Sequence, residues 1–197
     1  HGASHNHNLL KQHRMEAGGL DFNKNFKPVE TALEKELGFA PVIKKESNGW
    51  VYINEVGAAK SGKSMDKVKA AVCEKLLAND SILYAVDCEK VLTTTVPQPI
   101  RERIVNGYRK GRSGGIFIVP KAGWEDVDGS DKYIGTTHAQ WNPYDAHIPF
   151  VMVGWNVPHG QTSTEAHITD IAPTICAMLH IQMPNSCVGK AMNDYLK

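Results

Sequence analysis

The segment from Gly135 to Pro149 combines residue types that could bind a metal ion or take part in catalysis. Its first part holds small and polar residues and His138, and it continues with a Pro-Tyr-Asp turn at 143–145 and a second histidine, His147. The apolar run 148–153 follows directly. Such a run predicts a strand, and loops held against buried strands commonly carry ligating and catalytic groups. Taken alone, His138 is more typical of an ordinary polar residue than of a metal ligand.

Two further segments have recognisable patterns. The run 169–174 reads Thr-Asp-Ile-Ala-Pro-Thr and leads into an apolar, helix-like stretch that ends at Leu179. We expect Asp170 at the N-terminus of this helix, where its side-chain oxygens can accept backbone N–H groups. The chain itself opens with His1-Gly2-Ala3.

The three patterns together resemble the alkaline phosphatase superfamily. The pattern around His138 is similar to a loop near the C-terminus of those enzymes, and the run 169–174 to their D-(I/V)-x-P-T segment. His1-Gly2 resembles the end of their Asp-His-Gly metal motif. The resemblance covers roughly the first 25 and the last 80 residues, and within the superfamily the chain resembles most the zinc-dependent, phosphate-irrepressible alkaline phosphatases of Bacteroidetes type.

This resemblance implies a function and a site. The expected function is hydrolysis of phosphate monoesters at a two-zinc site by a serine or threonine nucleophile, and the implied metal ligands in this chain are His1 and His138. We expect the nucleophile and the other ligands in an N-terminal part that this chain lacks, so no catalytic or cofactor-binding residue is assigned within it. Related activities in the superfamily, as phosphodiesterase, sulfatase or phosphoglycerate mutase, stay open.

The resemblance also implies the setting of the protein. Because the chain starts inside a motif, we interpret it as a C-terminal fragment that has little activity by itself. Its expected partners are a small phosphate ester and the missing N-terminal part of the same chain, and its expected location is the periplasm or the exterior of the cell. We expect the other early histidines, His5, His7 and His13, to form a loosely ordered polar tail.

One motif competes with this interpretation. Residues 57–64, Gly-Ala-Ala-Lys-Ser-Gly-Lys-Ser, fit the phosphate-cradling pattern G-x-x-x-x-G-K-[ST]. A phosphate cradle of this type follows a buried parallel strand, which reads as a continuous apolar run. The preceding run 50–56 instead alternates, and it follows an Asn48-Gly49 hairpin signal. We therefore favour a turn that caps a helix and keep a nucleotide-binding module that uses Gly57–Ser64 as the alternative.

Composition describes an ordinary globular protein. The 197 residues are 42% hydrophobic and 22% charged, with a formal net charge of +1. This balance gives no electrostatic case for nucleic acid or an anionic membrane as a partner, and no apolar run approaches the length of a membrane-spanning helix. The four cysteines, Cys73, Cys88, Cys176 and Cys187, lack the C-x-x-C spacing of a zinc or redox motif. We expect buried thiols, although pairing of 73 with 88 and of 176 with 187 stays open.

Periodicity predicts the elements between these motifs. Helices are expected over 29–37, 65–77 and 99–108, and strands over 40–45, 50–56, 82–86 and 116–119. The fold class is α/β: residues 1–26 and 115–197 are expected to form the C-terminal part of an alkaline-phosphatase-like core. Residues 27–114 are expected to form a small inserted α+β subdomain that roofs the site.

Three more polar residues have two possible roles each. Arg109 or Arg112 could approach a phosphate group, but a solvated turn before the strand 116–119 is the favoured interpretation. Asp145 could orient a zinc-bound histidine or could cap the turn after Pro143.

Overall fold

The computed structural model describes residues 2–154 and 156–196. The chain forms two compact units, His1–Ile148 and Pro149–Lys197, and each is described by itself. His1 lies outside the described residues, so its predicted role as a metal ligand stays a prediction. In the part of the chain that the structure describes, no helix is long and apolar enough to cross a membrane.

A four-stranded sheet organises the first unit. Its strands are β2 (Ile43–Ser47), β3 (Trp50–Ile53), β4 (Ile82–Asp87) and β5 (Ile116–Pro120). They lie in the order β2-β3-β5-β4, and each neighbouring pair is antiparallel. The predicted hairpin is confirmed, because Asn48 and Gly49 join β2 to β3 with φ angles of 52° and 81°, which are typical of an Asn-Gly turn. Residues 116–120 thus share a sheet with strands from the region 27–114.

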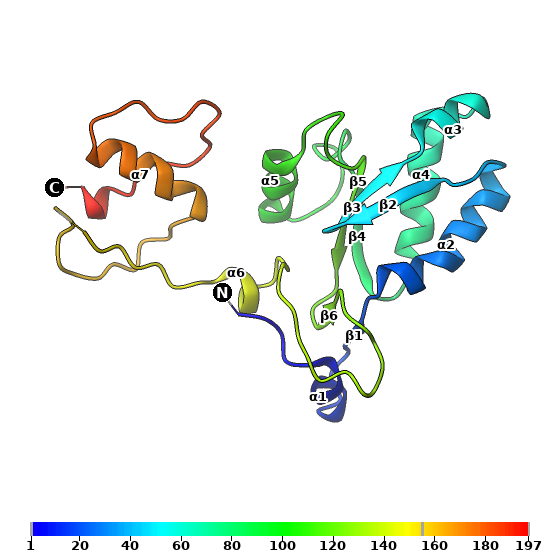
Figure 1. The fold of residues 1–197 in the computed structure, drawn as a ribbon, viewed down its shortest axis with the longest axis horizontal. Helices are drawn as coiled ribbons and strands as arrows, with labels where there is room; N and C mark the ends of the chain where they lie inside the picture. Colours follow the sequence, from blue (N-terminus) through cyan, green and yellow to red (C-terminus); the bar gives the residue numbers. More distant parts are fainter. Residues whose placement is uncertain (1, 155, 197) are drawn as a thin grey trace. The chain divides into compact units, whose positions relative to one another are not determined.

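Helices cover both faces of this sheet, as Figure 1 shows. Helices α2 (Phe22–Leu37) and α4 (Met65–Leu77) lie on one face, and α5 (Gln98–Gly107) lies on the other. The predicted bounds of α4 are confirmed, and α2 ends at Leu37 as predicted, with Gly38 after it in the left-handed region. The predicted start of α2 was wrong: the Asp21 carboxylate caps a helix that begins at Phe22 and contains Pro28. The predicted strand 50–56 was too long, because Asn54 caps helix α3 (Glu55–Lys60).

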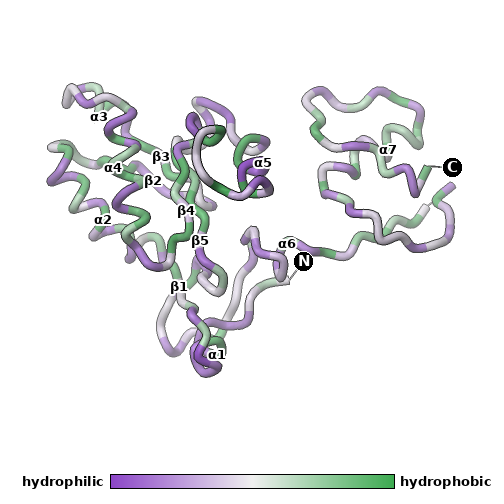
Figure 2. Tube along the Cα trace, turned by 180° about the vertical axis from the view of Figure 1, so that it is seen from behind, coloured by the Kyte–Doolittle hydropathy of each residue, from purple (hydrophilic) through white to green (hydrophobic). Residues whose placement is uncertain are grey.

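The alternation of side chains along the strands divides the apolar interior into two clusters. One lies under α2 and α4 and includes Ile116 and Ile118, and the other lies under α5 and includes Val119. Strands β4 and β5 are strongly hydrophobic in Figure 2. Cys73 packs against the first cluster and Cys88 belongs to the second, and both remain thiols. Burial raises the pKa of Cys73 to about 11 and that of Cys88 to about 12.

The second unit has little regular structure. It contains helix α7 (Ile171–Met178), a short 3-10 turn directly before it, η1 (Ile168–Asp170), and a second 3-10 turn near the C-terminus, η2 (Asn193–Tyr195). Asp170 precedes α7 as predicted, but its carboxylate accepts the backbone N–H groups of His167 and Lys190 rather than those of the helix. Cys176 and Cys187 are also free thiols.

The predicted strand over 148–153 is wrong for this structure. Residues 148–153 form no strand, and the side chains of Val151 and Val153 are 81% and 89% exposed. A strand requires a neighbour that pairs with its backbone groups, and this apolar run pairs with no strand among the described residues.

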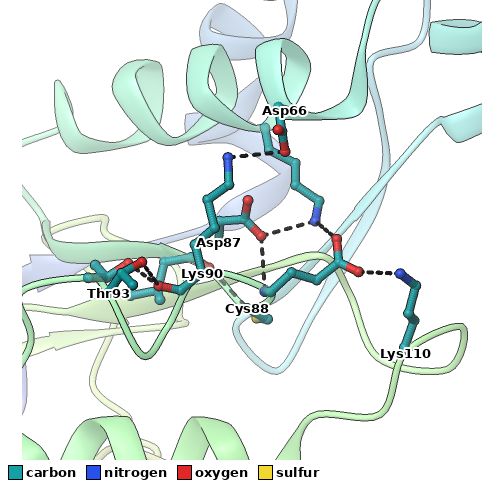
Figure 3. A network of polar contacts seen from close by, with 10 residues as sticks. Asp66, Asp87, Cys88, Lys90, Thr93 and Lys110 are labelled. Atoms are coloured by element: carbon teal, nitrogen blue, oxygen red, sulfur yellow. Dashed lines mark hydrogen bonds and ion pairs between the residues drawn. The ribbon is translucent and has the colours of Figure 1, made fainter.

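A buried lysine joins α4 to the end of β4. The Nζ atom of Lys69 lies 3.0 Å from Asp87 Oδ1 and 2.6 Å from Glu89 Oε2, and Lys110 Nζ lies 2.6 Å from Glu89 Oε1. Figure 3 shows this chain of ion pairs. Burial by itself lowers the pKa of Lys69, but the hydrogen bonds to Glu89 and Asp87 outweigh burial and the pKa is raised.

Removing this lysine should destabilise the first unit. Lys69→Ala leaves Asp87, whose side chain is 12% exposed, without its cation. We expect a loss of about 3 kcal/mol in the free energy of unfolding, measured by urea denaturation at pH 7. The matched control is Lys75→Ala, because Lys75 pairs with Glu36 at the surface, and its loss should stay below about 1 kcal/mol. Equal losses in the two variants would contradict a structural role for the buried pair.

The same network predicts a pH dependence. Hydrogen bonds from Lys110 and then Lys69 lower the pKa of Glu89 from 4.5 to about 2 in the folded chain. A depressed pKa stabilises the folded state above pH 4.5, and this contribution disappears as the pH falls toward 2. The difference in unfolding free energy between the wild type and Glu89→Gln should therefore be largest above pH 5 and shrink below pH 4. It should be at most about 1 kcal/mol, because Glu89 is 38% exposed. A difference that grows toward low pH would rule this out.

Candidate metal-binding region around His138

The segment that precedes His138 is bound to the N-terminal residues of the chain. The side-chain amide of Asn6 donates hydrogen bonds to the carbonyl oxygens of Tyr133 and Gly135, at 3.1 and 2.6 Å. The nearby Asn8 donates to two carbonyl groups of the same segment. In Figure 1 the chain after β6 passes beside helix α1 (His7–Gln12). Two segments more than 120 residues apart in the sequence, both of which carry a predicted ligand, thus meet in one region.

A fully buried carboxylate lies at this junction. Glu125 belongs to strand β6 (Trp124–Glu125), which pairs in parallel with β1 (Gly18–Gly19), and its side chain is 0% exposed. Its Oε1 atom accepts hydrogen bonds from Ser4 Oγ and Thr136 Oγ1, both at 2.6 Å. No sequence motif singled out Glu125. The one available signal was its position directly after the apolar strand and Trp124.

The loop after His138 is closed by its own polar groups. The backbone N–H of Gln140 donates to Asp145 Oδ2 at 2.6 Å, and the Tyr144 hydroxyl donates to Gln140 Oε1 at 2.9 Å. Asp145 is buried and lies in the short helix α6 (Pro143–Ala146). Its hydrogen bond to Gln140 supports the interpretation of Asp145 as a residue that closes this turn. Burial raises the pKa of Tyr144.

The imidazole of His138 is exposed at the surface of the first unit. The residue that follows, Ala139, has a φ angle of 83°, a conformation that L-residues rarely adopt without support from the surrounding structure. In residues 2–154 and 156–196, no three histidine, cysteine, aspartate or glutamate side chains form a group that could hold a metal ion. Zinc in proteins takes three or four protein ligands. His138 therefore has the donor chemistry of a zinc ligand, but a complete site needs further donors.

The other histidines have ordinary environments, with one exception. His5, His13, His147, His159, His167 and His180 are all exposed. His7, predicted to lie in a loose tail, is instead 0% exposed and stacks on Tyr133 with the ring centroids 5.8 Å apart. Asn6 caps α1, so His7 begins a helix instead of lying in a loose tail.

The residues of the competing motif do not form a phosphate-binding loop. Gly57 lies inside helix α3, and Ser64 caps α4 by accepting the N–H of Lys67. A Cβ atom at Gly57 would lie 2.6 Å from Asn54 and 2.8 Å from Phe39, so packing explains this glycine. The strand before the motif, β3, is antiparallel to both of its neighbours. The favoured interpretation of Gly57–Ser64, a helix-capping turn, agrees with this geometry.

The basic turn before β5 is solvated. Arg109 and Arg112 are exposed, and the Ser113 hydroxyl closes the turn by accepting the backbone N–H of Arg109 at 2.9 Å. This arrangement agrees with the favoured interpretation of the turn.

A hollow of about 470 Å³ lies between α2 and the β2–β3 hairpin. Its lining includes the stacked rings of Phe22 and Phe26 and the carboxyl groups of Glu30, Glu46 and Asp126, and burial raises the pKa of all three carboxyls. His138 is not among the lining residues, so this hollow is separate from the candidate region.

Comparison with curated proteins finds two alkaline phosphatases that are similar to this chain. It is 33% identical over 196 residues to alkaline phosphatase PafA of Elizabethkingia meningoseptica, of which it covers 35%. It is 44% identical over 131 residues, or 66% of this chain, to alkaline phosphatase PhoV of Synechococcus elongatus, of which it covers 23%. A protein of Myroides odoratus named calcium-transporting ATPase is 36% identical over all 197 residues, and the chain covers 36% of it. No family model matches the chain.

Solved structures give the same result. The crystal structure of wild-type PafA matches the whole of this chain with a TM-score of 0.87 and 34% sequence identity, and the chain covers 37% of it. A PafA variant with four substitutions matches equally well. The chain therefore spans about a third of the relatives that it matches along its whole length. The predicted resemblance to alkaline phosphatases is therefore confirmed along the whole chain, and the chain has the α/β fold of the matching part of PafA.

Proposed function

We propose that this chain is part of a metal-dependent hydrolase of phosphate monoesters, in which His138 and His1 bind zinc. The observation that carries the proposal is the contact between the N-terminal segment and the segment before His138. The whole of this chain matches part of PafA. The nucleophile and the other zinc ligands are assigned to residues outside this chain. The resemblance favours the periplasm or the cell exterior as the location.

The role of His138 follows from its position and chemistry. Its ring is exposed, while the backbone on its N-terminal side is fixed by Asn6 and by the Thr136 hydroxyl. A fixed backbone limits the positions that the imidazole can reach, which lowers the entropy lost when the histidine binds a metal ion. When bound, zinc would stabilise negative charge on the oxygens of the reacting phosphate group.

The proposal also covers the substrate of the enzyme and the role of residues 27–114. A small phosphate monoester is the proposed substrate, and phosphodiester, sulfate ester or phosphoglycerate chemistry is the alternative within the superfamily. Residues 27–114 are proposed as the subdomain that roofs the site. Relative rates on monoester and diester substrates of the same leaving group would decide between the first two activities.

Removal of His138 tests the proposal. In the full-length protein, His138→Ala should lower kcat/KM for a phosphomonoester by several orders of magnitude, because zinc supplies several kcal/mol of transition-state stabilisation. Excess zinc should restore part of the loss. The melting temperature should change little, because Asn6 and Thr136 hold the segment. Lys63→Ala, in the turn between α3 and α4, is the control and should change kcat/KM less than about tenfold. Near-wild-type activity of His138→Ala would overturn the proposal.

Nucleotide binding is the second candidate function. The sequence at 57–64 fits a phosphate-binding motif, and one relative of this chain is named an ATPase. The helical conformation of Gly57 and the antiparallel β3 argue against it. Adding ATP and magnesium should therefore leave the melting temperature of this chain unchanged. A ligand at 100 times its dissociation constant would stabilise by about 2.7 kcal/mol. A rise of several degrees that Lys63→Ala abolishes would favour nucleotide binding instead.

A further inference from the structure

The buried carboxylate of Glu125 has a position that packing alone does not explain. Its side chain is 0% exposed, and its Oε2 atom has no hydrogen-bond partner among the described residues. Burying a carboxylate is costly unless all of its charge is compensated. A residue with only a packing role at this position would be better uncharged.

The groups that Glu125 does bind lie close to the predicted zinc ligands. Ser4 is three residues after His1, and Thr136 is two residues before His138. Both hydroxyls lie 2.6 Å from the same oxygen, Glu125 Oε1, a distance typical of strong hydrogen bonds to an ionised acceptor. Thr136 Oγ1 also lies 2.9 Å from the backbone oxygen of Ser4, so the two segments touch directly.

Glu125 is itself rigidly held. It pairs with Gly19 in the β1–β6 ladder, and its backbone oxygen accepts the N–H of Leu20 at 2.6 Å. One oxygen atom on a fixed strand thus holds two segments that are more than 120 residues apart in the sequence. A metal site binds tightly when its ligands are held in place before the metal arrives.

We propose that Glu125 is a positioning residue that, through the Ser4 and Thr136 hydroxyls, fixes the two segments carrying the zinc ligands. This inference rests on the proposed function, since it assumes that His1 and His138 bind zinc. Glu125 contacts neither the metal nor the substrate in this role. Its effect is on zinc affinity, and through affinity on activity at limiting zinc.

Zinc affinity of the full-length protein, measured by competition with a chromophoric chelator, tests the proposal. Thr136 is exposed, so its substitution should leave the protein folded. Thr136→Val removes the hydroxyl and should raise the zinc dissociation constant about 10- to 100-fold. Thr136→Ser keeps the hydroxyl and should therefore bind zinc about as tightly as the wild type. Glu125→Gln keeps the shape without the charge and should also weaken zinc binding.

The matched control is Glu46→Gln, which changes a half-buried carboxylate that serves the hairpin by accepting the N–H of Gly49. It should leave the zinc dissociation constant unchanged. At saturating zinc, kcat of Thr136→Val should return close to the wild-type value, which a misfolded protein would not show. If Thr136→Val and Glu125→Gln lower only the melting temperature and leave the dissociation constant unchanged, the proposal is wrong.

A further variant separates this inference from the function on which it rests. If His138→Ala weakens zinc binding but Thr136→Val does not, the positioning role fails and the zinc site stands. If His138→Ala also leaves the zinc affinity unchanged, the proposed function fails together with the inference.

Discussion

The pairing of β5 with both β3 and β4 is the interaction on which the first unit depends. Residues 116–120 enter the sheet between strands that precede them by at least 29 residues, and their alternating side chains supply both apolar clusters. The chain then leaves β5 and reaches Glu125 within five residues of Pro120. The sheet therefore sets the position of the carboxylate at which the N-terminal segment and the segment before His138 meet.

Local sequence patterns predicted most helices and strands of this fold, because these elements depend on residues that are close together in the sequence. Asn48-Gly49 specifies its hairpin and Ser64 caps α4, and both features form as expected. Errors occurred where two local signals compete. Pro28 suggested a helix start, but the Asp21 cap prevailed, and Asn54 ended a strand that the apolar pattern alone would continue. The prediction of a strand over 148–153 was wrong because a strand needs a pairing partner, and the described residues offer none.

The candidate site was less accessible from the sequence. Resemblance directed attention to His138, which the structure places on a segment held by Asn6 and Thr136. The hydrogen bonds that hold this segment join residues near positions 4 and 136, and no local periodicity reports such a distant pairing. For the same reason His7, expected in a loosely ordered tail, is found buried, and no sequence signal reported the burial of Glu125. The sequence does not indicate that a charged residue is buried when the groups that form hydrogen bonds with it are distant along the chain.

Zinc binding by His138 in the full-length protein can be seen directly in a crystal structure of the zinc-loaded protein, with anomalous scattering recorded on both sides of the zinc absorption edge. We expect an anomalous peak at about 2.0–2.1 Å from a ring nitrogen of His138. Peaks at fully loaded zinc sites with the His138 ring bound to none of them would contradict this expectation.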